Sequence, residues 1–155
     1  MHPNVVAVAE ALRAAGSAGE VRELPATART AALAAEQLGV PVGAIANSLL
    51  FDAAGSPLLI LTSGAHRVDT ARVMRLLGIT ALDRADPEFV RRYTGQPIGG
   101  VAPIGHPAPI GTLVDVALAG FAVVWAAAGH PAAVFPTTYD ELLRITAGSA
   151  AEVGD

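Results

Sequence analysis

The stretch TGQPIGGVAPIGH, residues 94–106, sets the organisation of this chain. It holds four glycines and two prolines within thirteen residues, which is too many for a helix or a regular strand. Glycine lets a ligand approach the main chain, and proline fixes φ. We predict a shaped loop whose backbone N–H groups could hold a phosphate, a carboxylate or a developing oxyanion. An irregular connection without a ligand is the alternative, and these residues alone favour neither. The P-loop pattern GxxxxGK[ST] and the dinucleotide pattern GxGxxG are absent.

Length and composition indicate one domain that spans residues 1–155. Hydrophobic residues make up 52% of the chain, so a sizeable core is available. No apolar run reaches the ~18 residues of a membrane helix. The segment Met1–Asn4 lacks the basic region of a signal peptide. We therefore expect a cytoplasmic protein that makes no membrane contact.

The charged residues exclude several kinds of site. The net charge is −4, all ten basic residues are arginine, and the chain has no cysteine. Without lysine there is no Schiff base or ammonium clamp, and without cysteine there is no thiol chemistry or zinc thiolate. The acidic balance argues against a DNA-binding protein, although a small basic patch could still contact a few phosphates.

Hydrophobic periodicity and capping residues predict helices and strands interspersed along the chain. The predicted helices cover residues 3–15, 31–38, 68–77, 87–93 and 139–146. The predicted strands cover residues 21–24, 45–53, 57–62, 79–82, 112–116, 123–127 and 132–135. Residues 45–53 and 57–62 form an apolar hairpin that we expect at the centre of the sheet. Leu76 and Leu77 are expected to face inward with Val73, and the tail from Gly148 to be frayed. This order favours an α+β domain over a doubly wound parallel sheet.

No side chain stands out as a nucleophile or general base. The four histidines form no HExxH or other close pair, so the sequence gives little support for a metal site. No serine lies in a GxSxG elbow. His66 and His106 each lie near a glycine and could reach a common cleft. Asp115 lies in an apolar strand, where a buried carboxylate needs a partner, and we expect N–H groups of the glycine loop to supply it.

Five stretches resemble, in order and spacing, the YbaK/prolyl-tRNA synthetase-associated family. They are residues 27–39, 45–51, 62–69, 94–105 and 125–135. This family comprises trans-editing aminoacyl-tRNA deacylases and the editing domain inserted in bacterial prolyl-tRNA synthetases. The resemblance implies a single compact α+β domain with a curved, mostly antiparallel, barrel-like sheet flanked by helices.

The resemblance also implies an activity: hydrolysis of the ester that joins a wrong amino acid to the 3′ end of a tRNA, with no metal or other cofactor. Gly100, with Gly99 and Val101 beside it, would hold the ester carbonyl and its oxyanion. A water or a hydroxyl of the terminal adenosine would attack. The substrate implied is tRNA(Pro) carrying alanine, serine or cysteine. The partners implied are the acceptor end of an aminoacyl-tRNA and a synthetase or other translation factor.

The chain departs from the family on the central strand, where a lysine followed by threonine or serine is replaced by Asn47-Ser48. The family lysine is expected to contact the terminal phosphate or ribose, and Asn47 supplies no charge. Losing such a contact costs ~1.5–3 kcal/mol. Arg29 and Arg67 lie in matching motifs and could supply the charge instead. The other residues expected to contact the substrate are Ser48, Ser63 and His130.

The replaced lysine keeps a second hypothesis open. The chain would then be a non-catalytic binding domain of the same fold, which recognises a tRNA 3′ end, a nucleotide or a small acyl ligand. Asn47 is the residue that supports this alternative, because it replaces the family's lysine with an uncharged side chain.

Overall fold

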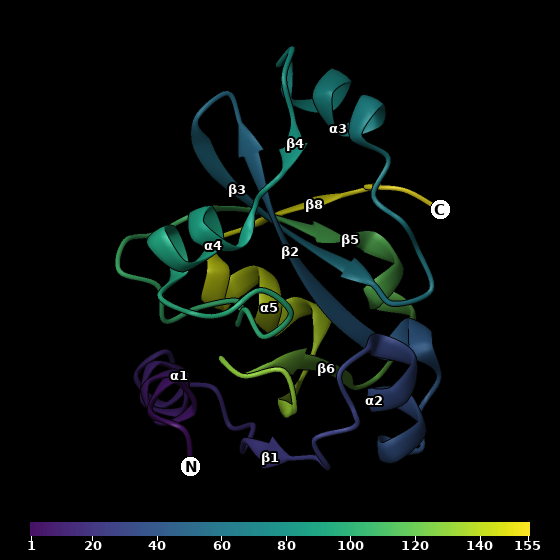
Figure 1. The fold of residues 1–155 in the computed structure, drawn as a ribbon. Helices are drawn as coiled ribbons and strands as arrows, with labels where there is room; N and C mark the ends of the chain where they lie inside the picture. Colours follow the sequence, from purple (N-terminus) through teal and green to yellow (C-terminus); the bar gives the residue numbers. More distant parts are fainter.

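A mixed β-sheet with helices on its faces and ends forms the body of the protein (Figure 1). The computed structural model describes residues 1–155. The helices are α1 (Pro3–Ala14), α2 (Ala31–Leu38), α3 (Thr70–Leu77), α4 (Pro87–Thr94) and α5 (Tyr139–Thr146), with short 3-10 turns η1 (Val42–Ala44) and η2 (Val116–Gly120). The strands are β1 (Arg22–Glu23), β2 (Ile45–Ala53), β3 (Ser56–Ser63), β4 (Asp83–Arg84), β5 (Gly111–Asp115), β6 (Val124–Ala127), β7 (Ala133–Thr137) and β8 (Ser149–Ala151).

The sheet has the strand order β1-β7-β6-β2-β3-β5-β8, and β4 also pairs with β2. The antiparallel pairs are β1–β7, β6–β7, β2–β3 and β2–β4. The parallel pairs are β2–β6, β3–β5 and β5–β8. The predicted α+β class and mixed sheet are therefore confirmed. The sheet is open, because β1 and β8 at its two ends do not pair with each other, so the barrel-like core does not close.

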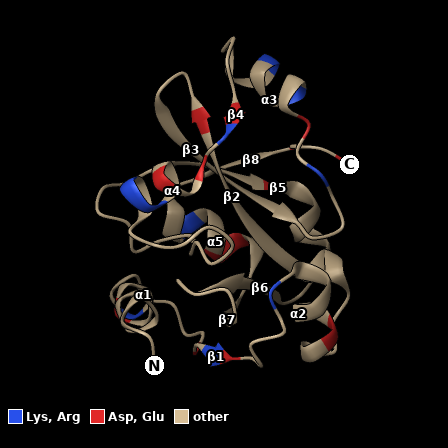
Figure 2. Ribbon diagram, viewed as in Figure 1, with Lys and Arg blue, Asp and Glu red and all other residues tan.

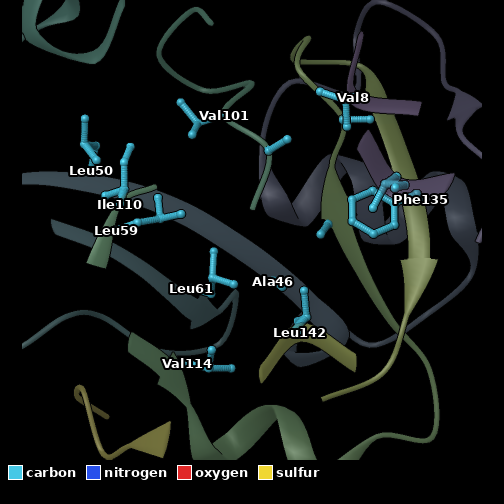
Figure 3. Close-up of a cluster of buried hydrophobic side chains, with 14 of the residues drawn as sticks. Val8, Ala46, Leu50, Leu59, Leu61, Val101, Ile110, Val114, Phe135 and Leu142 are labelled. Atoms are coloured by element: carbon cyan, nitrogen blue, oxygen red, sulfur yellow. The ribbon is translucent and has the colours of Figure 1, made fainter. Parts of the chain in front are cut away.

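The β2–β3 hairpin forms the centre of the sheet, as its apolar sequence predicts (Figure 1). Alternate residues of β3 point to opposite faces. Leu59 and Leu61 join the larger apolar cluster, which Figure 3 shows in close-up, whereas Leu58 and Ile60 join a second cluster. Val73 of α3 covers this second cluster. Both faces of the hairpin are thus buried, which explains why its strands are apolar almost throughout.

One edge of β2 is left open over a short stretch. β3 pairs along the whole of the other edge. On the open side, β6 pairs with β2 only at Ile45 and Ala46, and β4 pairs only at Phe51 and Asp52. Two of the residues of β2 between these pairings, Asn47 and Ser48, line a cavity together with Gly99 and Val101 of the glycine loop. This gap in the sheet positions the candidate site.

Polar side chains inside the glycine loop fix its shape. The loop begins where α4 ends, at Gly95, whose φ of 71° lies in the left-handed region. The hydroxyl of Thr94 donates to the Val90 carbonyl at 2.6 Å and accepts from the Gln96 N–H at 3.0 Å. Gln96 is buried, and its Oε1 accepts from the Ala102 N–H at 2.7 Å. These bonds tie the start of the loop to α4 and join Ala102 back to Gln96.

Several local predictions are wrong. The strand expected at residues 79–82 lies at Asp83–Arg84 instead. In α3 only Val73 is buried, whereas Leu76 and Leu77 are 56% and 39% exposed. The helix lies at the edge of the sheet, so one turn reaches the core.

The C-terminal tail is also ordered rather than frayed. Residues Ser149–Ala151 form β8, which pairs in parallel with β5. Val153 is fully buried, and its carbonyl accepts from the Asp69 N–H. The parallel pairing joins segments that are distant in sequence, and three residues are too few for a periodic signal.

Asp115 is bonded to the β3–α3 loop and not to the glycine loop as expected. Its side chain is 1% exposed. One oxygen accepts from the Ser63 N–H at 3.0 Å, lies 3.0 Å from Nδ1 of His66, and lies 3.3 Å from the Thr62 hydroxyl. The other oxygen accepts from the Ala117 N–H at 3.0 Å. The carboxylate therefore joins β3, β5 and η2 at one end of the sheet.

We predict that Asp115→Asn destabilises the fold. An amide has one acceptor oxygen, so its NH₂ group would face donors that now bond to a carboxylate. Each buried donor left without a partner costs about 1–3 kcal/mol. Urea unfolding measures the loss, with Asp83→Asn on the exposed strand β4 as the control. Equal midpoints for the two variants would contradict this role for Asp115.

We also predict that His106 makes the stability depend on pH. Its Nε2 donates to the Ala102 carbonyl at 2.8 Å, and burial lowers the pKa of His106 below its usual value. The unfolded chain then binds the proton more readily, so stability is full above pH ~6.5 and falls as the pH drops below that value. In the His106→Gln variant, the side chain can still donate a hydrogen bond, but it does not titrate. Its free energy of unfolding should fall less between pH 7.5 and pH 5 than that of the unchanged protein. Parallel pH profiles would contradict the assignment.

Candidate functional site

A small cavity of about 50 Å³ lies where the glycine loop faces the open edge of β2. Asn47 and Ser48 line it from the strand, and Gly99 and Val101 line it from the loop. Its other walls come from Ala28, Arg29, Thr30, Ala31, Ala34, Ile45, Ala46, Trp125, Ala127, Pro131 and Val134. This volume exceeds that of a single water, and it suits a small group of a few atoms. It is too small for a nucleotide.

Two glycine-loop residues that line this cavity, Gly99 and Val101, have backbone N–H groups without a protein acceptor. Val101 is 2% exposed, so its N–H is a buried donor without a partner, which is rare in proteins. The Gly100 N–H, in contrast, donates to the Pro97 carbonyl at 3.0 Å and closes a turn. The two N–H groups without an acceptor therefore belong to the neighbours of Gly100, which is the residue predicted from the sequence to hold the oxyanion.

Ser48 adds a polar side chain to the same cavity. Along β2, Ser48 lies on the face shared with Ala46 and Leu50, both of which belong to the larger apolar cluster. Its hydroxyl is buried and has no hydrogen-bond partner. A buried polar atom without a hydrogen-bond partner lowers the free energy of unfolding by about 1–3 kcal/mol, so the unpaired Ser48 hydroxyl calls for an explanation. A ligand that enters the cavity would supply the missing partner.

Gly100 holds the loop against the turn between β6 and β7. A Cβ on Gly100 would lie 2.7 Å from the carbonyl carbon of His130 and 2.8 Å from the nitrogen of Pro131. Both are backbone atoms, which cannot move aside as the end of a side chain can. The φ of Gly99 is 87°, a value that favours glycine. The two adjacent glycines thus serve different needs, one for close packing and one for backbone angle.

A larger cleft of about 550 Å³ lies next to the small cavity. The two share Arg29 and Pro131. The other residues that line the cleft are His2, Asn4, Ala26, Arg91, Gly95, Pro97, His130 and Ala132. Arg29 and Arg91 form no ion pair with an acidic residue. Charged residues lie mainly on the helices and strand ends, leaving the middle of the sheet uncharged (Figure 2).

The structure brings most of the predicted site residues together. Gly99, Val101, Asn47, Ser48 and Arg29 line the small cavity, and Gly100 packs beside it. His130 lines the larger cleft.

Two predicted substrate-contacting residues lie elsewhere. The Ser63 hydroxyl donates to the Gly43 carbonyl at 2.8 Å, and neither Ser63 nor Arg67 lines the cavity or the cleft. The backbone of Arg67 bonds to Asp155 at the C-terminus. His66 and His106 do not share a cleft, because His66 contacts Asp115 whereas His106 bonds to the glycine loop itself. No group of three or more His, Asp or Glu side chains is placed to hold a metal ion.

Sequence reasoning did not single out Arg91 or assign a role to His2. Arg91 lies in the last turn of α4, just before the glycine loop, so its position next to the loop was available as a signal. His2 reaches the cleft from the start of α1, and no pattern in the sequence indicates that contact.

Comparison with known proteins agrees with this geometry. Residues 25–145 match the family model for the aminoacyl-tRNA editing domain. A proline–tRNA ligase of Geobacter sulfurreducens is 38% identical over 68 residues, which are 44% of this chain and 12% of the ligase. The chain thus matches only a small part of such ligases. The uncharacterized protein YwhH of Bacillus subtilis is 32% identical over 124 residues, covering 79% of this chain and 78% of YwhH.

A solved structure supports the same relationship. A protein described as a candidate trans-editing enzyme for prolyl tRNA synthetase superposes with a TM-score of 0.95 and 41% identity, over 100% of this chain and 99% of the other. In this chain, no helix has the length and apolar character needed to cross a membrane. The family match, the open edge of β2 and the free donors of the glycine loop lead to one conclusion: this chain belongs to the aminoacyl-tRNA editing domain family, and it is related to the editing domains of prolyl-tRNA synthetases.

Proposed function

We propose that residues 1–155 act as one editing domain that hydrolyses the ester of a mischarged tRNA, with tRNA(Pro) as the favoured substrate. The observation that carries this proposal is that Gly99 and Val101, whose N–H groups have no protein acceptor, both line one small cavity. Such donors fit an oxygen that gains negative charge during acyl transfer. The family match and the relatives among proline–tRNA ligases support the choice of an aminoacyl ester.

In this mechanism the amino acid enters the small cavity, and its ester carbonyl oxygen accepts from the Gly99 and Val101 N–H groups. A water, which the free hydroxyl of the terminal ribose can orient, adds to the carbonyl carbon and gives up a proton. The bond between that carbon and the ribose oxygen then breaks, and the ribose oxygen takes up a proton. Removing one such donor typically costs 10²–10³ in rate, about 2.7–4 kcal/mol, so backbone donors can supply a large part of the acceleration.

The cavity also limits which amino acid is accepted. Its size suits alanine, serine or cysteine, and each extra methylene discriminates by about 1–3 kcal/mol. The Ser48 hydroxyl, which has no hydrogen-bond partner, adds a preference for an amino acid with a polar side chain. A serine or cysteine side chain would give this hydroxyl a partner, whereas alanine would leave it unpaired. We propose that seryl and cysteinyl esters are hydrolysed faster than the alanyl ester.

The direct test is single-turnover release of labelled amino acid from tRNA(Pro) charged with alanine, serine, cysteine or proline. We expect release from a mischarged species and none from the prolyl ester. Gly100→Ala should slow release at least about tenfold, because its Cβ would push the loop away from the His130–Pro131 backbone.

Gly120→Ala is the matched control, since open space surrounds that glycine. Thermal unfolding of both variants shows whether the fold survives. Absence of release from all four charged species would contradict the proposal. It would favour the alternative, a non-catalytic binding domain, which the uncharged Asn47 on β2 supports.

Ser48→Ala tests whether the Ser48 hydroxyl selects amino acids with a polar side chain. The variant should hydrolyse the seryl ester roughly tenfold more slowly while changing the alanyl rate little, since a hydrogen bond of this kind is worth ~1–1.5 kcal/mol. The ratio of kcat/KM for the two esters is the measurement. An equal fall for both esters would show that Ser48 contacts the ester itself and would contradict its role in selection.

A further inference from the structure

The Val101 N–H lies between two peptide groups that are each held by a hydrogen bond. It belongs to the peptide group that joins Gly100 to Val101, and a peptide group is a rigid plane. The preceding plane is held because the Gly100 N–H donates to the Pro97 carbonyl at 3.0 Å. The following plane is held because the Ala102 N–H donates to Oε1 of Gln96 at 2.7 Å. The direction of the Val101 N–H is therefore set from both sides.

Only one of these two hydrogen bonds depends on a side chain. The Gly100–Pro97 bond joins backbone to backbone, whereas the acceptor for the Ala102 N–H is the side chain of Gln96. Gln96 is 4% exposed and Ala102 is fully buried, so this bond is sheltered from water. Hydrogen bonds in such a low-dielectric environment are stronger than in water. Without the Gln96 oxygen, the buried Ala102 N–H would have no protein acceptor, and the peptide group after Val101 would lose its hold.

Gln96 is itself held in place by α4. The hydroxyl of Thr94, which is 2% exposed, accepts from the Gln96 N–H at 3.0 Å and donates to the Val90 carbonyl at 2.6 Å. The other polar group of Ala102, its carbonyl, accepts from Nε2 of His106 at 2.8 Å. Side chains of the loop thus occupy both backbone polar groups of Ala102. A continuous series of hydrogen bonds runs from α4 to the residue next to Val101.

We infer that Gln96 is a positioning residue for ester hydrolysis: by holding the peptide group that follows Val101, it sets the direction of the N–H that receives the oxyanion. This role rests on the proposed function for its reaction. Gln96 lines neither the small cavity nor the larger cleft, so it acts without touching the substrate. Oxyanion donors are effective because they are already in place, and a misplacement of about 1 Å can cost ~100-fold in rate. Gln96 therefore affects the chemical step rather than the affinity for the tRNA.

Gln96→Met tests this role, because methionine has a similar length but offers only a weak acceptor. With seryl-tRNA(Pro) as substrate, kcat should fall roughly 10–100-fold while KM changes little, as expected for an interaction that acts in the transition state. Asp115→Asn is the matched control, since it removes buried hydrogen bonds outside the glycine loop. Below its unfolding midpoint it should keep its kcat, so a loss of stability alone would not explain a slow Gln96→Met variant.

Thr94 offers a conservative pair of variants for the same series of bonds. Thr94→Val keeps the size of the side chain and removes the hydroxyl that holds Gln96, whereas Thr94→Ser keeps the hydroxyl. We expect kcat to fall in Thr94→Val and to be retained in Thr94→Ser. Because Thr94 acts through Gln96, the double variant should be little slower than Gln96→Met alone. Two losses that multiply in full would show independent roles and would overturn the series from α4.

Amide NMR gives a readout that does not depend on hydrolysis. In Gln96→Met, the Ala102 N–H should exchange with solvent roughly tenfold faster, as expected for the loss of one hydrogen bond. The ¹H–¹⁵N residual dipolar coupling of Val101 should also change, while the couplings of α5 stay as they are. An unchanged Val101 coupling would overturn the positioning role, whatever the activity of the protein.

The kinetic and NMR results separate this role from the proposed function. Full kcat in Gln96→Met, in a protein that does release amino acid, would overturn the role of Gln96 and leave the hydrolysis intact. A changed Val101 coupling in a protein that releases nothing would have the opposite meaning. Gln96 would then direct the Val101 N–H as inferred, and the proposed hydrolysis would fail.

Discussion

The close contact between Gly100 and the peptide that joins His130 to Pro131 is the constraint on which the site depends. No side chain fits at Gly100, since its Cβ would lie within 3 Å of backbone atoms. This contact brings the glycine loop against the β6–β7 turn and leaves the small cavity beside it, with the larger cleft continuing past Pro131. The neighbouring residues Gly99 and Val101 line the cavity, and their N–H groups have no protein acceptor.

The sheet supplies the second half of the site by leaving part of β2 unpaired. On one edge of β2, the pairing with β6 ends at Ala46, and the pairing with β4 begins at Phe51. The hairpin itself is buried on both faces, and Val101 belongs to the same apolar cluster as Leu50 and Leu59 (Figure 3). The Val101 donor is thus anchored in the core, whereas Gly99 lies at the surface. Such anchoring is what a preorganised oxyanion site requires, because donors already in place need no rearrangement during reaction.

Local patterns predicted much of the fold, and contacts between distant segments account for what they missed. The bounds of α2, β2 and α5 follow from caps, glycines and apolar runs, and the structure confirms them. The pairing of β8 with β5 and the partners of Asp115 depend on residues far apart in sequence. For the site, the glycine loop and β2 were predictable as a pair through family resemblance. The occupied N–H of Gly100, the unpaired hydroxyl of Ser48 and the position of Arg91 in the cleft are visible only in three dimensions.

In the proposed mechanism, the Gly99 and Val101 N–H groups hold the ester oxygen. The most direct measurement is the amide NMR spectrum of the protein on addition of adenosine that carries serine through a non-hydrolysable 3′-amide. We expect the amide signals of Gly99 and Val101 to shift and to exchange more slowly with solvent, whereas the Gly100 amide, already bonded to the Pro97 carbonyl, should keep its exchange rate. Saturating analogue that leaves the Gly99 and Val101 amides unchanged would contradict the account.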